Sequence, residues 1–143
     1  MDGALSPNDR LEACTPIGDP LPGADDVTAA PDDGTIYVPA GRRVLKLMRE
    51  NFWRRAVFAE FEDIVGGLAL HPDGRLLACV AGRGLAAVDA AGRQSWLTQA
   101  EDQPLHCPTS VAAAADGTIF LSDGSSRHRP EDWLRDLMEK NHL

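Results

Sequence analysis

The sequence lacks any apolar run long enough to cross a membrane, because no stretch approaches the roughly 18 consecutive apolar residues that a spanning helix needs. Basic residues are also scarce, since 14 Lys and Arg stand against 22 Asp and Glu and give a formal net charge of −8. This acidity argues against nucleic acid and anionic membranes as partners, because both attract basic surfaces. Residues 1–14 lack the basic region and apolar core of a secretory signal, so we expect a cytoplasmic protein.

Cysteine is sparse as well, with three residues, Cys14, Cys79 and Cys107, that show no C-x-x-C spacing. An odd number of cysteines without paired spacing is typical of reduced thiols that pack as small hydrophobic side chains. Zinc ligation by the three thiols and a histidine has no spacing to support it. The apolar fraction of 43% and the charged fraction of 25% indicate a folded globular chain, and 143 residues fit one domain.

What the sequence does contain is a repeat. Three segments each carry a run of small and apolar residues, then Asp-Gly, then a run of aliphatic or aromatic residues. The glycines of the Asp-Gly pairs lie 40 and 43 residues apart, at Gly34, Gly74 and Gly117. Periods near 40–50 residues are typical of β-propeller blades, whereas a β-sandwich shows strands without this longer period.

Each repeat predicts the strands of one blade. Asp-Gly predicts a hairpin with a type I′ turn, because Gly adopts the positive φ that the turn requires. The small residues before it suit an innermost strand, and the bulky residues after it fill the space between neighbouring sheets. Third and fourth strands are expected at 43–48 and 56–61 in the first unit, joined by a turn over 49–55, and at 84–89 and 95–98 in the second.

The third unit departs from this pattern after Asp123. Pro130 suits the first position of a helix, and the next two residues, Glu131 and Asp132, are acids that the helix dipole favours there. A helix over about 131–141 is therefore predicted. Four of its residues recur at helical spacing and form an apolar face that we expect to pack against protein: Trp133, Leu134, Leu137 and Met138.

These elements predict an all-β protein of about three propeller blades with one C-terminal helix, and the resemblance described next implies that this is half of a six-bladed ring. The blade units span about 24–61, 62–100 and 104–143 and form a single half-propeller domain over residues 1–143. The N-terminal segment 1–20 is expected to be partly extended.

Three stretches resemble the strictosidine synthase-like proteins, which group with the gluconolactonases and senescence-marker proteins as six-bladed propellers. The resemblance runs from about Leu21 onward and is carried by LPGADDVTAAPDDGTIYV, by GLALHPDGRLLACVAGRGLAAVD and by PTSVAAAADGTIFLSDGSSR. The family has six blades, and this chain matches only its N-terminal half. We expect either a piece of a longer propeller or a natural half-propeller, whose three blades do not close a ring alone.

The resemblance implies a site at one end of the central channel, where family members often bind calcium through oxygen ligands. Asp25 matches a glutamate ligand of the family, Thr109 matches an asparagine ligand, and Val80 stands where the family tends to carry an aspartate. The remaining ligand belongs to a later blade, so we expect no cofactor in one chain and calcium only in a completed ring. The candidate ligand-binding residues at the channel mouth are Asp25, His106, Thr109, Ser110 and Asp123.

Two function classes follow. The first is a non-catalytic or ligand-binding half-propeller that assembles, as a homodimer, into a propeller-like ring and binds a small molecule. The alternative is a metal-dependent lactonase or hydrolase of the gluconolactonase and strictosidine synthase-like type, active only in the assembled ring. The first is favoured, and no catalytic residue is assigned, because the catalytic glutamate of strictosidine synthases lies in a later blade.

Two further polar clusters have structural interpretations. Asp123, Ser125, Ser126 and His128 are close in sequence, but catalytic triads assemble from distant segments. The cluster instead predicts a turn in which hydroxyl groups bond to the local backbone. His71 precedes the second Asp-Gly pair, and a surface position in that turn is expected.

Overall fold

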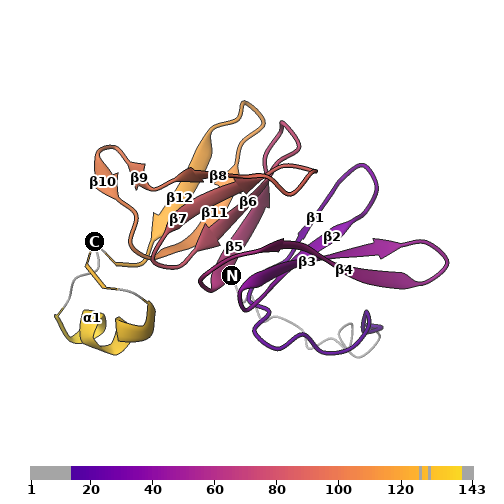
Figure 1. The fold of residues 1–143 in the computed structure, drawn as a ribbon, viewed down its shortest axis with the longest axis horizontal. Coiled ribbons are helices and arrows are strands. Elements are labelled where there is room, and N and C mark those ends of the chain that lie inside the picture. Colours follow the sequence, from indigo (N-terminus) through magenta and orange to yellow (C-terminus); the bar gives the residue numbers. More distant parts are fainter. Residues whose placement is uncertain (1–13, 126, 129, 140–143) are drawn as a thin grey trace, which may run out of the picture.

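The computed structural model describes residues 14–139 except 126 and 129, and it is built almost entirely from antiparallel sheets (Figure 1). Two sheets have four strands in sequence order, one sheet has two strands, and a small hairpin lies between the second and the third. This meander of sheets confirms the prediction of an all-β half-propeller. Among the described residues, no helix is both long and apolar enough to span a membrane.

The strands follow the repeat closely. The first sheet contains β1 (Thr28–Ala29), β2 (Ile36–Ala40), β3 (Arg43–Arg49) and β4 (Trp53–Glu60). The second sheet contains β5 (Val65–Leu70), β6 (Leu76–Val80), β7 (Gly84–Val88) and β8 (Gln94–Leu97). The hairpin pairs β9 (Gln99–Ala100) with β10 (Gln103–Pro104), and the third sheet pairs β11 (Pro108–Ala113) with β12 (Ile119–Asp123).

The Asp-Gly hairpins are not the type I′ turns that we predicted. Of each Asp-Gly pair only the glycine has a positive φ, which is 87° at Gly74. The N–H of Gly74 donates to the carbonyl of His71 at 2.9 Å, and the N–H of His71 donates to the carbonyl of Arg75 at 2.9 Å. These bonds define a type I turn followed by one left-handed residue, a three-residue loop that needs only a single positive φ and that recurs at Gly117. The first loop is one residue longer, because the N–H of Gly34 donates to the carbonyl of Ala30 at 3.1 Å.

Each of these loops is fixed by its own aspartate. Asp73 Oδ1 accepts the backbone N–H of Arg75 at 3.1 Å, and Asp33 and Asp116 make the same bond two residues onward at 2.9 Å. An aspartate that bonds its own backbone two residues on mimics a backbone turn. The pair Asp-Gly therefore supplies two separate requirements of the loop, a side-chain acceptor and a residue that tolerates positive φ.

The second sheet is buried on both faces, and this sets the position of the core. Leu76, Ala78 and Val80 of β6 pack in one cluster with Val44 and Ala59 of the first sheet. The alternate residues of β6 pack in a second cluster with three residues of the third sheet, Val111, Ala113 and Leu121. Side chains alternate between the two faces of a strand, so a strand between two sheets reads as a continuous apolar run.

The first sheet has one covered face and one outer face. Opposite Val44 and Leu45 a β-bulge in β4 turns both Phe58 and Ala59 toward the second sheet. On the outer face Val57 is 47% exposed. The turn expected over 49–55 is shorter than predicted, because β4 pairs with β3 from Trp53 onward through arginines that face solvent.

The C-terminal helix forms, but the described side chains of its predicted apolar face, among which that of Trp133 is not included, are not packed. A 3-10 turn (Pro130–Asp132) leads into α1 (Trp133–Glu139), which confirms a helix in this region, while the predicted end at 141 lies outside the described residues. The side chains of Leu134 and Leu137 are both 56% exposed and that of Met138 is 77% exposed, contrary to our expectation. In Figure 1 the helix lies below the strands, on the side away from the first sheet. Glu139 connects it to His128 at 3.0 Å and also accepts a bond at 3.0 Å from Arg135 within the helix.

Candidate functional site

The inner strands of the sheets carry irregularities at the same point of the repeat. The pairing register shifts between Val65 and Leu68 in β5 and between Pro108 and Ser110 in β11. Counting back five residues from the strand residue that opens each Asp-Gly loop (Ala30, His71 and Ala114) reaches Asp25, Gly66 and Thr109. β-Bulges often redirect side chains near functional sites, so the register shifts mark this end of the inner strands as a candidate site.

At this level the inner strands of the second and third sheets approach each other closely. A Cβ atom added to Gly67 would lie 2.7 Å from the carbonyl oxygen of Thr109 and 2.8 Å from the Cα atom of Ser110. Real Cβ atoms essentially never come so near to backbone atoms. Glycine is therefore required at position 67 because the backbone of β11 occupies the space of a side chain.

A carboxylate joins the first sheet to the second. Asp26 Oδ1 accepts the N–H of Val27, and Asp26 Oδ2 accepts the N–H of Leu68 in β5, both at 2.7 Å. The sequence interpretation selected the neighbouring Asp25, which lies exposed in the loop before β1. No sequence signal distinguishes Asp26, because the first loop is one residue longer than the others and the register aligns Asp25 with Thr109.

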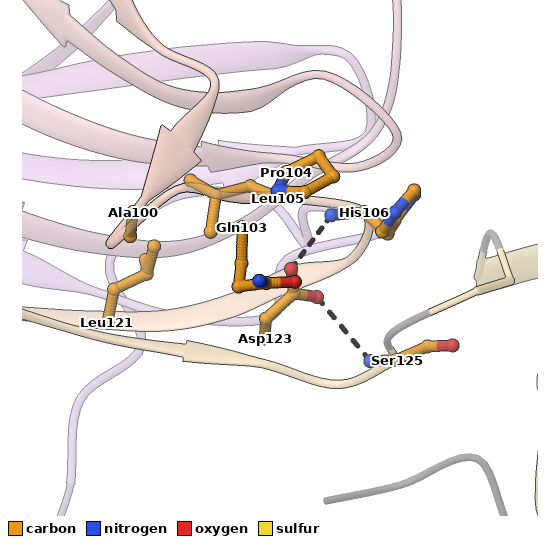
Figure 2. Close-up of a pocket in the computed structure, with 8 residues that line it drawn as sticks. All are labelled: Ala100, Gln103, Pro104, Leu105, His106, Leu121, Asp123 and Ser125. Atoms are coloured by element: carbon orange, nitrogen blue, oxygen red, sulfur yellow. Dashed lines mark hydrogen bonds between the residues drawn. The ribbon is translucent and has the colours of Figure 1, made fainter.

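A second carboxylate holds the segment that enters the third sheet (Figure 2). Asp123 Oδ2 accepts the N–H of His106 at 2.8 Å, and Asp123 Oδ1 accepts the N–H of Cys107 at 2.6 Å and that of Ser125 at 3.4 Å. The carbonyl of His106 in turn accepts the N–H of Gly82 at 3.0 Å. Asp123 and His106 together therefore connect the third sheet to the β6–β7 turn of the second.

Burial and these carboxylates together control the chemistry of a thiol in β6. Burial, followed by the nearby charges of Asp26 and Asp123, raises the pKa of Cys79 to about 12. The thiol is 0% exposed and stays protonated at neutral pH, so it is not a nucleophile. Cys79 confirms the expected packing of a reduced cysteine, whereas Cys14 is exposed and departs from it.

The candidate calcium ligands of one chain do not fit calcium. Thr109 Oγ1 lies 2.9 Å from Ser122 Oγ, which also accepts the N–H of Ser110 at 3.2 Å, so the Thr109 hydroxyl is already engaged within the sheet. Calcium takes about 6–8 oxygen ligands. The residues described in the structure contain no group of three or more His, Cys, Asp or Glu that could hold a metal ion.

A hollow of about 300 Å³ lies beside Asp123, between the β9–β10 hairpin and β12 (Figure 2). It brings together two of the predicted site residues, His106 and Asp123, while Asp25, Thr109 and Ser110 do not line it. The hairpin residues that form one wall carry no sequence motif and were not predicted. The lining residues are Ala100, Gln103, Pro104, Leu105, His106, Leu121, Asp123 and Ser125.

The predicted hydroxyl turn is confirmed after Asp123. Ser125 Oγ accepts the N–H of Arg127 at 3.1 Å and the N–H of His128 at 2.9 Å, while Ser126 lies outside the described residues. The expectation for His71 is wrong. Its side chain is only 14% exposed, and Nε2 lies 3.2 Å from the carbonyl oxygen of Gly117, so it connects the second Asp-Gly loop to the third.

Meanders of antiparallel strands packed face to face define this chain as part of a β-propeller. No protein-family model matches the sequence, and no curated protein matches it. A solved gluconolactonase from Xanthomonas campestris, described as important in glucose secondary metabolic pathways, is similar in structure with a TM-score of 0.62. The two sequences are 23% identical, and the match covers 71% of this chain and 35% of the gluconolactonase. The chain thus spans about a third of that propeller, and the likeness establishes the fold.

Proposed function

We propose that this chain is a binding and assembly module, a propeller half that closes a six-bladed ring with a second copy and holds a small molecule at the channel mouth. The use of its two carboxylates supports a non-catalytic role. Asp26 and Asp123 accept backbone N–H groups with both oxygens at 2.6–2.8 Å, so these carboxylates position strands. Carboxylates held in this way serve structure rather than proton transfer or metal binding.

The contrast between buried and exposed blade faces supports assembly. Both faces of strand β6 in the second sheet are covered, whereas Val57 of the first sheet and Phe120 of the third are 47% and 63% exposed. A two-fold axis would bring the first sheet of one copy against the third sheet of the other, and would make the same contact twice. Such a pairing gives each outer face the neighbour that the second sheet already has.

The hollow beside Asp123 supports the binding of a small ligand. Its volume of about 300 Å³ is at the lower end of the range of small-molecule sites. Ala100, Leu105 and Leu121 supply apolar walls, and the side-chain amide of Gln103, which lies beside Asp123, supplies a polar group (Figure 2). We include a cytoplasmic location in this proposal, in keeping with the thiol form of all three cysteines.

The molecular mass in solution tests the assembly. Sedimentation equilibrium of the full chain should give about twice 15.4 kDa over a wide range of concentration. A folded monomer that persists at high micromolar concentration would contradict the proposal.

The likeness to a gluconolactonase favours a second candidate, a lactonase that gains its metal site when the ring is complete. This candidate predicts that the purified assembly binds calcium stoichiometrically and opens gluconolactone to its acid in a calcium-dependent way. Metal analysis, together with acid release followed by a pH indicator with and without a chelator, separates the two functions. We expect neither stoichiometric calcium nor chelator-sensitive acid release.

A further inference from the structure

The third sheet ends in an open strand edge. Among the residues that the structure describes, β12 pairs with β11 and with no other strand, whereas the first two sheets have four strands each. The N–H of Ala114 donates to the carbonyl of Thr118 at 2.8 Å, so these two residues form a hydrogen-bonded pair. Such pairs alternate along an antiparallel ladder. Phe120 therefore bonds to β11, while Ile119 and Leu121 turn their backbone N–H and C=O groups toward the open edge.

This edge of β12 is a template for one more strand, because its backbone donors and acceptors recur every second residue. Natural edge strands are commonly protected by proline, by lysine or by a bulge. The strand sequence Ile119–Asp123 (IFLSD) contains neither proline nor lysine, and its register with β11 is regular from Ile119 to Ser122. The edge is therefore suited to adding an extended segment through backbone bonds.

A segment with matching spacing precedes the first sheet. Thr15, Pro16 and Ile17 are exposed and belong to no helix or strand of the structure. The β-branched residues Thr15 and Ile17 favour a strand, and proline is tolerated in an edge strand when its nitrogen faces away from the neighbour. When Thr15 and Ile17 turn their backbone groups toward a neighbouring strand, Pro16 turns away from it. The two-residue spacing equals that of Ile119 and Leu121.

This segment lies on the outer face of the first sheet. Ile17 lines a hollow of about 210 Å³ together with Leu47 of β3. Leu47 is opposite Arg55, which is two residues from Val57 on β4, so these side chains share the outer face. Figure 1 shows the start of the described chain, in indigo, beside the first sheet. The segment therefore covers part of β3 and β4, the two strands farthest from the inner strand β1.

The proposed dimer brings this segment to the open edge of β12. Each sheet begins with its inner strand and adds strands outward in chain order. When the third sheet of one copy faces the first sheet of the second copy, β11 and β12 lie opposite β1 and β2. The outer strands of that face carry their own N-terminal segment, which lies in the same layer as β12 and directly outward from it. The third sheet and the segment thus cover different strands of one face.

We infer that Thr15–Ile17 of one copy adds a third strand to the open edge of β12 in a second copy. The backbone groups of Thr15 and Ile17 bond to those of Ile119 and Leu121. This inference rests on the proposed dimer and names the strand that extends its third sheet. Because Leu121 also lines the hollow beside Asp123, the added strand borders the proposed ligand site.

Amide hydrogen exchange of the full chain, measured by NMR at a concentration where it is dimeric, provides the first test. The amides of Ile119 and Leu121 should be protected like that of Phe120. Thr15→Pro removes one backbone donor of the added strand, so Ile119 and Leu121 should exchange roughly tenfold faster, while Phe120 changes by less than about threefold. Sedimentation should show that the dissociation constant rises by roughly tenfold. Thr15→Val keeps the N–H and the β-branched shape, and it should leave all these values within about twofold.

A mixed dimer identifies the copy that supplies the strand. One copy carries ¹⁵N and the other is unlabelled, and the two are mixed and allowed to exchange partners. Isotope-filtered nuclear Overhauser contacts should connect the labelled amides of Ile119 and Leu121 to protons of Thr15 and Ile17 in the unlabelled copy. Contacts found only within one copy would mean that each chain covers its own edge, which contradicts the inference.

The outcomes separate this inference from the proposed function. A stable dimer in which Ile119 and Leu121 exchange without protection shows that the edge stays open, so the inference is wrong while the dimer stands. Protection that Thr15→Pro leaves unchanged means that another segment pairs with β12, with the same consequence. A chain that stays monomeric at every concentration removes the dimer and the added strand together. Protection that depends on Thr15, with contacts between copies, supports both.

Discussion

Replacing Gly67 by alanine tests the close approach of the two inner strands. The added Cβ would meet Thr109 O at 2.7 Å and Ser110 Cα at 2.8 Å, whereas ordinary contact begins near 3.4 Å. Both obstacles are backbone atoms, so β5 and β11 must separate by about 0.6–0.7 Å. Overpacking of this kind costs roughly 1–3 kcal/mol, and the lower chain entropy of alanine offsets about 0.5–1 kcal/mol.

The net expectation for Gly67→Ala is a loss of about 1–2 kcal/mol in the free energy of unfolding. For a chain of this size that loss lowers the melting temperature by roughly 3–8 °C. Urea unfolding followed by circular dichroism gives the free energy, and an unchanged dependence on urea concentration would show that the variant unfolds from a native state of similar compactness.

The neighbouring Gly66 offers a matched control, because its added Cβ would meet only Thr109 O, at 3.2 Å. A shift of about 0.2 Å relieves that contact, so Gly66→Ala should change the free energy by less than about 0.5 kcal/mol. If Gly67→Ala is as stable as the parent, or if the two variants lose equal stability, the strands do not approach as described.

Three further predictions concern single side chains. Asp123→Ala should lower the free energy of unfolding by about 1–3 kcal/mol, because two charge-assisted bonds to backbone N–H groups are lost, whereas Asp25→Ala should change it by less than about 0.5 kcal/mol in the same urea assay. Side-chain and backbone hydrogen bonds from Arg75 hold the pKa of Asp73 well below its usual range, so its contribution to stability is present above about pH 4 and is lost as pH falls through the lower folded pKa. Asp73→Asn should therefore lose less stability than the parent between about pH 4 and the acid end of the range. An unchanged dependence of the free energy of unfolding on pH in acid would contradict this. Iodoacetamide at pH 8 should modify Cys14 within minutes and Cys79 only on unfolding, as mass spectrometry of peptides would show, because burial and nearby carboxylates raise the pKa of Cys79 to about 12.

The period of the Asp-Gly pairs was enough to predict the sheets, because a fixed spacing of turns within an apolar pattern leaves few other architectures. It did not predict the turn type. The predicted type I′ turn and the observed loop both place glycine at a positive φ. They differ in the residue before the glycine, which has a negative φ here. The only described non-glycine residues with positive φ are Glu101 and Asp102, between β9 and β10. No glycine stands in this turn, so the sequence did not predict it.

The site residues were predicted less well because their roles depend on contacts between sheets. Asp25 and Asp26 are adjacent acids, and only the structure shows that Asp26 reaches the N–H of Leu68, 42 residues onward. His71 also bonds across sheets, to Gly117, although its local sequence is that of an exposed turn. The exposed face of α1 is a similar case, because helical spacing predicts an apolar face but not what covers it.

The burial of β6 on both faces has a consequence for how this protein can change over generations. Every one of its five residues contacts a neighbouring sheet, so a substitution at any position of the strand disturbs the packing of one of the two cores. In β4 and β12 alternate positions face outward, so in an isolated chain every second residue would be free to vary. A deep substitution scan in living cells would therefore report on assembly. Intolerance at Val57 and Phe120 as strict as that in β6 would reveal that selection acts on a closed ring rather than on a solitary half.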